Sequence, residues 1–200
     1  RFSGTAPVVT LATDVGDSGR SLFIGPDDHK GGRAAGDLMG LMRHPAGGEV
    51  LMIAGTLANA GQSAREAGFQ AILAERHPDT HLVGVLETGE DSDTAGRMVD
   101  QALRQNPAIR GIYHTSTGAV QIVQALERLR RSINTVVITH EMTPNRARLL
   151  AERKLSAVID QKPMLEARLA VEAMARLLGR LPGEPRSITT EIQIFMPETV

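Results

Sequence analysis

The sequence contains no cysteine and no tryptophan, and its 200 residues include one tyrosine and four phenylalanines. The absence of cysteine excludes disulfides and thiolate metal sites, but it fits the cytosol and the bacterial periplasm equally well. No apolar run approaches the roughly 20 residues of a membrane-spanning helix, and residues 1–5 have neither the apolar core nor the flanks of a signal peptide. An initiator methionine is also absent, which fits a processed or trimmed piece of a longer chain.

An excess of charge of one sign is absent as well. The formal net charge is -1, and no basic run or patch interleaved with aromatic residues occurs. This chain is therefore not expected to grip the phosphates of nucleic acid. The composition does not exclude a DNA-binding module outside this chain.

Catalytic and metal-binding motifs are missing too. The sequence has no phosphate-binding glycine-rich loop ending in Lys-Ser/Thr, no dinucleotide fingerprint and no Gly-x-Ser-x-Gly elbow. His140 and Glu141 begin like a zinc-protease helix, but Pro144 stands where the second histidine would be. We therefore predict a protein that is not an enzyme and has neither a cofactor nor a metal site.

Short apolar runs dominate the stretch from Gly48 to Gln161. Each run is rich in β-branched residues and too uniformly apolar for a strand with one face in water, which indicates buried parallel strands. The five runs are Val50–Ala54, His81–Leu86, Ile109–Tyr113, Thr135–Thr139 and Leu155–Ile159.

Segments of helical length and period separate these runs. Asn59 is a good cap for the first of them, and the pairs His77-Pro78 and Asn106-Pro107 stop two of the helices. The alternation predicts an open, doubly wound α/β sheet. Such a sheet binds its ligands beyond the carboxyl ends of its strands.

The remaining residues predict another lobe, with strands at 7–11 and 21–25, a helix after Pro163 and an alternating strand at 187–194. A helix over residues 30–43 carries glycine at every fourth position, which indicates close approach to a sheet or a neighbouring helix. We predict a partial first lobe of residues 1–45 and 162–200 and a complete second lobe of residues 46–161. The predicted crossings lie near His44–Gly48 and Gln161–Pro163, where proline and glycine suit hinges.

Polar residues follow the strands of the predicted sheet. They are Asp91, Ser116, Glu141 and Gln161, joined by Arg65 near the front of a helix. Carboxylates, a guanidinium, an amide and a hydroxyl suit a small neutral molecule with many hydroxyls, because each can form directed hydrogen bonds. Polar residues after strands also cap helices, which is the commoner role for a lone Ser116 or Asp91. Glu141, Gln161 and Arg65 are poorer caps and stronger candidates.

The order of motifs resembles the ligand-binding core shared by periplasmic sugar-binding proteins and by lactose-repressor-type transcription regulators. The resemblance covers nearly the whole chain and depends on the combined order and spacing of its motifs. These motifs are Ala6–Leu11, Ile24–Asp28, Gly31–Asp37, Ala64–Gln70, Ile138–Glu141 and Ala157–Gln161.

The resemblance implies ligand contacts at Arg65, Ser116, Glu141 and Gln161. Ser116 stands where asparagine is usual, and Glu141 stands where aspartate is usual. An Asp-Arg pair is expected after the first strand, but this sequence has Ala12-Thr13-Asp14 there, so Asp14 becomes the candidate. The family's opening βα units are absent before Val8. We therefore expect unpaired strand edges and bare helix faces in the first lobe.

Three functions follow from these expectations. The leading hypothesis is the effector-binding core of a cytoplasmic, homodimeric transcription regulator. A sugar or polyol would close its lobes and alter DNA binding by an upstream helix-turn-helix. The alternative is a periplasmic solute-binding protein of a sugar transporter. A third is a sugar-acting enzyme with Glu141 as general base and Asp91 as acid. No membrane partner is expected.

Overall fold

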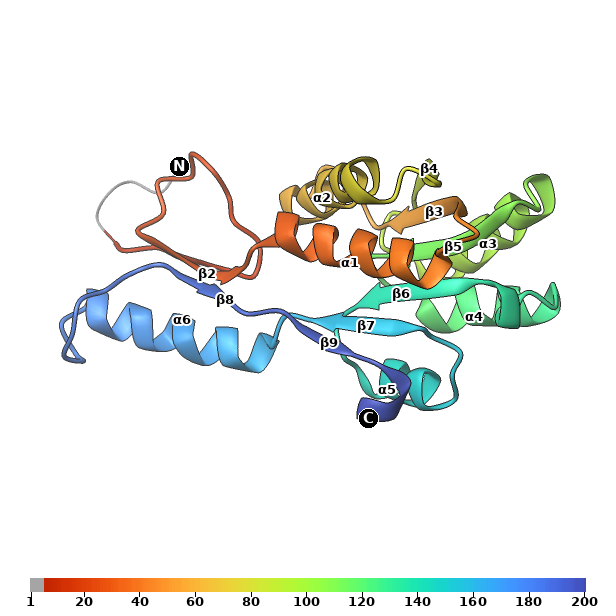
Figure 1. Cartoon of the computed structure of the whole chain (residues 1–200). Coiled ribbons are helices and arrows are strands. Elements are labelled where there is room, and N and C mark those ends of the chain that lie inside the picture. Colours follow the sequence, from red (N-terminus) through yellow and green to blue (C-terminus); the bar gives the residue numbers. More distant parts are fainter. Residues whose placement is uncertain (1–5) are drawn as a thin grey trace. The chain divides into compact units, whose positions relative to one another are not determined.

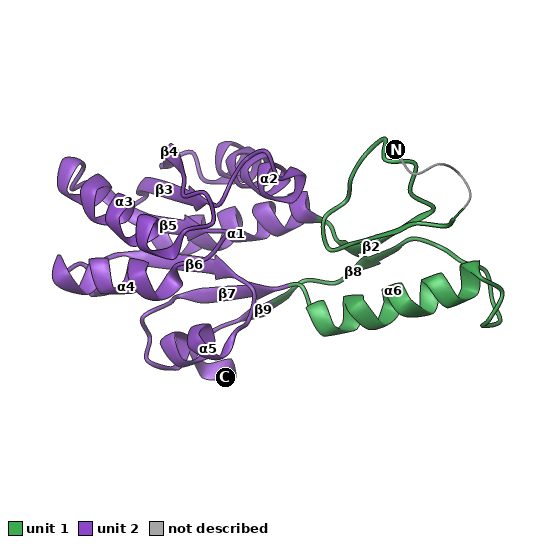
Figure 2. Ribbon diagram, turned by 180° about the vertical axis from the view of Figure 1, so that it is seen from behind, with its two compact units in different colours: residues 1–27, 161–193 green, residues 28–160, 194–200 purple. Residues whose placement is uncertain are grey.

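The structure is a computed structural model that describes residues 6–200 and divides the chain into two compact units (Figure 2). The first unit runs to Asp27 and takes up residues 161–193, and the second comprises residues 28–160 and 194–200. Residues 1–5, with the start of the predicted first lobe and the segment tested for a signal peptide, lie outside the described range. The fold is two-lobed α/β with parallel sheets, as the sequence predicts.

The second unit is built on a six-stranded sheet with the order β4-β3-β5-β6-β7-β9 (Figure 1). All five strands predicted in this stretch are present, and the four pairings among them are parallel. Their bounds are β3 Gly48–Ala54, β4 Thr80–Glu87, β5 Ile109–His114, β6 Val136–His140 and β7 Ala157–Asp160, with β9 at Gln193–Phe195.

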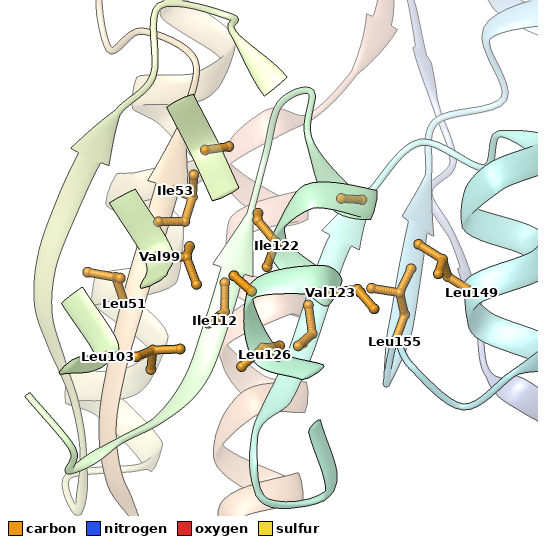
Figure 3. Packing of buried hydrophobic residues seen from close by; sticks show 14 of the residues in the cluster. Leu51, Ile53, Val99, Leu103, Ile112, Ile122, Val123, Leu126, Leu149 and Leu155 are labelled. Atoms are coloured by element: carbon orange, nitrogen blue, oxygen red, sulfur yellow. The ribbon is translucent and has the colours of Figure 1, made fainter. Parts of the chain in front are cut away.

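Three helices cover one face of this sheet and form its main core. Leu51 and Ile53 of β3 pack against Val99 and Leu103 of α3, and the cluster continues through α4 and α5 (Figure 3). Side chains alternate between the faces of a strand, so Val50 and Met52 point to the opposite face. The helices of the core face are α3 Ser92–Gln105, α4 Ala119–Arg128 and α5 Pro144–Ala151.

The opposite face carries α1 (Asp28–Arg43) and α2 (Ala60–Arg76), which pack closely on each other. A β-carbon at Gly32 would lie 2.0 Å from the backbone oxygen of Arg65, and one at Gly36 would lie 2.4 Å from Ile72 Cγ2. Only glycine permits this approach. The predicted reason for the glycine stripe, close packing against a neighbouring helix, is confirmed.

The first unit contains a three-stranded sheet with the order β1-β2-β8 and both pairings parallel. Helix α6 packs on it through Leu169, Ala173 and Leu177. Among the described residues, β1 pairs only with β2, so its other edge is open. The elements are β1 Val9–Leu11, β2 Leu22–Pro26, β8 Ile188–Thr190 and α6 Pro163–Leu177.

The unit boundaries differ from the predicted lobes of residues 1–45, 162–200 and 46–161 at two points. Helix α1 belongs to the second unit, because its glycine face packs on α2, so the boundary falls between Asp27 and Asp28 and not near His44. The predicted alternating tail strand is two strands, with β8 in one sheet and β9 in the other. The boundary at Gln161 coincides with the predicted crossing.

One strand differs from the prediction of full burial. Strand β4 is an edge strand, and Val83 within it is 44% exposed. Its apolar run resembles those of the central strands, so sequence alone does not distinguish an edge from a centre. Over residues 6–200, we find no helix with both the length and the apolar character for a membrane crossing.

Candidate functional site

A buried ion pair lies at the carboxyl edge of the second unit's sheet. Arg65, from the second turn of α2, places Nε 2.9 Å and Nη2 2.8 Å from Oδ1 of Asp28, the first residue of α1. Both side chains are about nine-tenths buried. The pair links the front ends of the two glycine-packed helices. Asp28 appears in the sequence analysis only as the end of the motif Ile24–Asp28, so its role as the partner of Arg65 is not predicted from the sequence.

A group of buried rings lies near this pair. Phe69 stacks on Tyr113 with ring centroids 4.6 Å apart, and the Tyr113 hydroxyl lies 2.7 Å from Nε2 of His140. Burial raises the pKa of Tyr113. Burial, assisted by the positive charge of Arg65, holds the pKa of His140 well below its usual range. Both side chains are therefore neutral at physiological pH, and His140 Nδ1 has no hydrogen-bond partner within residues 6–200.

Ser116 belongs to a second polar group, centred on Glu90. The Ser116 hydroxyl donates to Glu90 Oε2, and the Gln62 amide donates to Oε1 over 2.7 Å. Gln62 itself accepts from the backbone of Gly55 over 2.6 Å, which ties the group to the end of β3. Glu90 has a φ of +62° in the turn before α3. Sequence reasoning chose its neighbour Asp91 instead.

Glu141 lies at the end of β6 beside a buried arginine. Its φ is +65°, and its amide donates to Ile159 O over 2.8 Å, which fixes the residue between β6 and β7. One carboxylate oxygen lies 3.9 Å from Nη1 of Arg146, whose Nη2 donates to the carbonyl of Ser116. Burial lowers the pKa of Arg146, and Glu141 opposes that change. Arg146 was missed because it follows Pro144 inside a short helix.

Asp91 is the N-cap of α3. Its carboxylate caps α3 by accepting from the amide of Thr94 over 2.7 Å, and its side chain is 57% exposed. The hydrogen bonds from Thr94 lower the pKa of Asp91. A carboxyl group with a lowered pKa is ionised at neutral pH, which disfavours the acid role that the enzyme hypothesis gives to this residue.

Two predicted residues belong to the first unit. Asp14 forms a bidentate ion pair with Arg20 and accepts from the Thr10 hydroxyl over 3.1 Å. Arg20 and Thr10 hold the pKa of Asp14 below its usual range. Gln161 is buried and follows β7 directly.

The structure thus brings Arg65, Ser116 and Glu141 to one edge of the second unit, each with a partner that sequence reasoning did not name. Asp91 lies in the same connection as Glu90 but points to its own helix. Within residues 6–200, we find no group of three His, Cys, Asp or Glu side chains arranged to hold a metal ion.

A protein-family profile described as "Periplasmic binding protein domain" matches residues 4–183, which is most of the chain. A comparison with curated protein sequences gives no match.

Solved structures share the fold. A glucose-galactose binding protein from Geobacillus stearothermophilus superposes with a TM-score of 0.88 at 24% identity, over 96% of this chain and 68% of that one. An ABC transporter solute binding protein from Burkholderia graminis, in complex with D-arabinose, gives 0.86 at 24% identity, over 96% and 66% of the two chains. The fructose binding periplasmic domain of a hybrid two component system gives 0.85 at 17%, over 96% and 64%. This chain therefore spans about two thirds of their length.

Proposed function

The chain belongs to the periplasmic binding protein domain family, and we propose that it binds a sugar, a polyol or a similar hydroxylated small molecule. The observation that carries this proposal is the polar carboxyl edge of the second unit. Arg65, Glu90, Ser116, Glu141 and Arg146 are gathered there on consecutive connections of one parallel sheet. Open sheets of this type bind ligands beyond that edge.

The chemistry of this edge favours a neutral ligand with many hydroxyls. Each hydroxyl can donate to a carboxylate and accept from a guanidinium, and both kinds of group stand here within hydrogen-bonded pairs. The positive charges of Arg65 and Arg146 face the negative charges of Asp28 and Glu141. The similar structures described above are binding proteins for glucose and galactose or for fructose, or a complex with D-arabinose, and they support the same class.

Isothermal titration with a sugar panel tests the proposal. We expect one or more sugars to bind the intact protein, and Glu141→Gln and Glu90→Gln to weaken binding about tenfold or more, because each removes a charged hydrogen-bond acceptor. Glu152→Gln is the matched control. It removes an exposed carboxylate that pairs with Arg148 and Lys154 away from this edge.

Equal affinity in all three variants would contradict the assignment. Turnover of a bound sugar would instead support the enzyme hypothesis. Asp14, Asp91 and Gln161 remain proposed contacts, and the same titration with Asp14→Asn and Gln161→Leu tests two of them.

For the whole protein, a solute-binding component of a sugar transporter is the better supported context. Similar structures carry such names, among them a sugar-binding protein of a Bacillus halodurans transporter. A periplasmic location belongs to this proposal. In this proposal the two lobes also close on the ligand. Small-angle scattering with and without the bound sugar measures the change in dimensions.

A sugar-responsive transcription regulator is the second candidate. The amino-acid sequence of residues 139–144 and 160–163 favours it, because it resembles the lactose-repressor-type proteins more than the transport proteins. The genomic sequence upstream distinguishes the two. A helix-turn-helix there would support the regulator, with its cytoplasmic location and homodimer, and a signal peptide would support transport.

A further inference from the structure

A hollow of about 520 Å³ lies at the amino edge of the second unit's sheet, which the proposed sugar site does not use. Its wall includes Arg43 at the end of α1, Arg110 at the start of β5 and the connection that leads into β6. Pockets of about 300 to 1,000 Å³ hold small organic ligands in proteins. The hollow is therefore large enough for one.

Arginines without acidic partners gather at this hollow. Arg43 donates its Nε to Gly47 O over 2.9 Å, and Arg110 donates to the carbonyls of Pro107 and Ile109. Neither forms an ion pair with any residue of the described range 6–200. The Arg43 guanidinium and the Arg110 stem both lie within 4.0 Å of the place where a β-carbon on Gly48 would stand. The two side chains are thus close neighbours.

A third arginine adds to the same charge. Arg131 donates to the carbonyls of Pro107 and Ile109, the same two acceptors that Arg110 uses. Burial lowers the pKa of Arg131, and the positive charge of Arg110 lowers it further. Like charges held this close destabilise each other unless an anion lies near them.

Two hydroxyls of the hollow's lining lack partners. Ser132 Oγ and Thr135 Oγ1 are buried, and neither has a hydrogen-bond partner among residues 6–200. Only 7% of the Thr135 surface is exposed. A buried hydroxyl without a partner costs free energy, and a rotation of the Thr135 side chain toward the hollow would let it donate to a bound oxyanion.

The remaining cations of the lining are already neutralised. Lys154 Nζ lies 2.9 Å from both Glu127 and Glu152, and Arg153 pairs with Glu198. The unmatched positive charge of the hollow therefore comes from Arg43 and Arg110, with Arg131 beside them. Guanidinium groups bind phosphate through paired hydrogen bonds, so this is the ligand class that the arrangement suits.

We propose that this hollow is a second ligand site, which binds the phosphate group of a small molecule through Arg43, Arg110 and the Thr135 hydroxyl. The occupant is a phosphate monoester or free phosphate. The site is separate from the proposed sugar site, and the proposal does not depend on it.

Isothermal titration of the intact chain with inorganic phosphate and with glycerol 3-phosphate tests this at low ionic strength, where exposed charges are least screened. Glycerol alone is the uncharged comparison. We expect saturable binding with a Kd of about 1 mM or below. Sedimentation with phosphatidic acid vesicles distinguishes a lipid phosphate from a soluble one, and we expect the protein to stay in the supernatant.

The double variant Arg43→Gln, Arg110→Gln should weaken phosphate binding about tenfold or more. The matched control is Arg97→Gln, Arg104→Gln, which removes the same charge from the exposed face of α3 and should change the affinity less than about twofold. Absence of saturable binding to the intact protein, or equal weakening by both double variants, would overturn the proposal.

Thr135→Val keeps the test decisive if the arginine variant does not fold. Valine has the shape of threonine without the hydroxyl, so it removes the unpaired group. We expect unchanged or higher thermal stability together with phosphate binding several-fold weaker. Unchanged phosphate affinity in a folded Thr135→Val protein would remove the hydroxyl from the site and contradict the proposal as stated.

Discussion

The buried pair of Arg65 and Asp28 leads to a quantitative prediction. Both side chains are about nine-tenths buried, with Arg65 Nη2 2.8 Å from Asp28 Oδ1. Removing one member of a buried pair breaks the ion pair inside the protein, at a cost of about 3–5 kcal/mol. We therefore expect Asp28→Asn and Arg65→Gln each to lower the melting temperature by roughly 6–20 °C, at 2–4 °C per kcal/mol for a chain of this size.

A double-mutant cycle isolates the interaction. If the two groups act on each other, the double variant should cost less than the sum of the single ones, by about 1–3 kcal/mol. Urea unfolding followed by circular dichroism measures all four proteins. The exposed pair of Arg148 and Glu152, 3.0 Å apart, is the control, and its cycle should give a much smaller coupling, because water and salt screen exposed charges. Strict additivity at Arg65 and Asp28 would refute the reasoning.

Three further predictions follow from particular contacts. Gly32→Ala should destabilise the protein by about 1–3 kcal/mol in urea unfolding, because its β-carbon would strike the Arg65 backbone oxygen at 2.0 Å, whereas Gly16→Ala, with nothing within 4 Å, should be nearly neutral. Burial lowers the pKa of His114 from 6.5 to about 4, so the unfolded chain binds more protons between these values, and His114 should contribute a loss of stability of about 3 kcal/mol as pH drops through that window, in addition to the loss from buried His140. His114→Gln should make that slope less steep in melting temperatures measured across the window, with the His140 contribution remaining, and an unchanged slope would contradict the assignment. Asp91→Ala should destabilise the protein by loss of the α3 cap, while Asp91→Ser should retain most of the stability in the same unfolding measurement.

The sequence predicts most elements of this fold because its local signals agree with its packing. Asn59 caps α2, Pro144 starts α5, and β-branched runs mark the central strands. Sequence does not reveal which lobe a helix joins. The glycine face of α1 was read correctly as a close contact, but the identity of the partner, α2, depends on tertiary structure.

The sequence predicts the location of the candidate site better than it predicts the contacts within the site. The rule that ligands lie at strand ends led to Ser116 and Glu141, and a family resemblance supported both. It could not separate Glu90 from Asp91, since only the turn geometry shows which of the two neighbours points to Ser116 and which caps α3. Arg146 reaches Ser116 from the next connection, a contact that no local pattern contains.

The pairing at this edge also restricts the charge of the ligand. A guanidinium has five N–H donors, and Arg65 directs two of its nitrogens to Asp28. A neutral hydroxyl can accept from a remaining donor while the pair stays intact. A carboxylate or phosphate ligand would compete with Asp28 for the same charge and weaken a buried ion pair, which costs free energy. The geometry of Arg65 therefore favours neutral sugars over acidic ones at this edge, and titration of a sugar beside its uronic acid measures the difference directly.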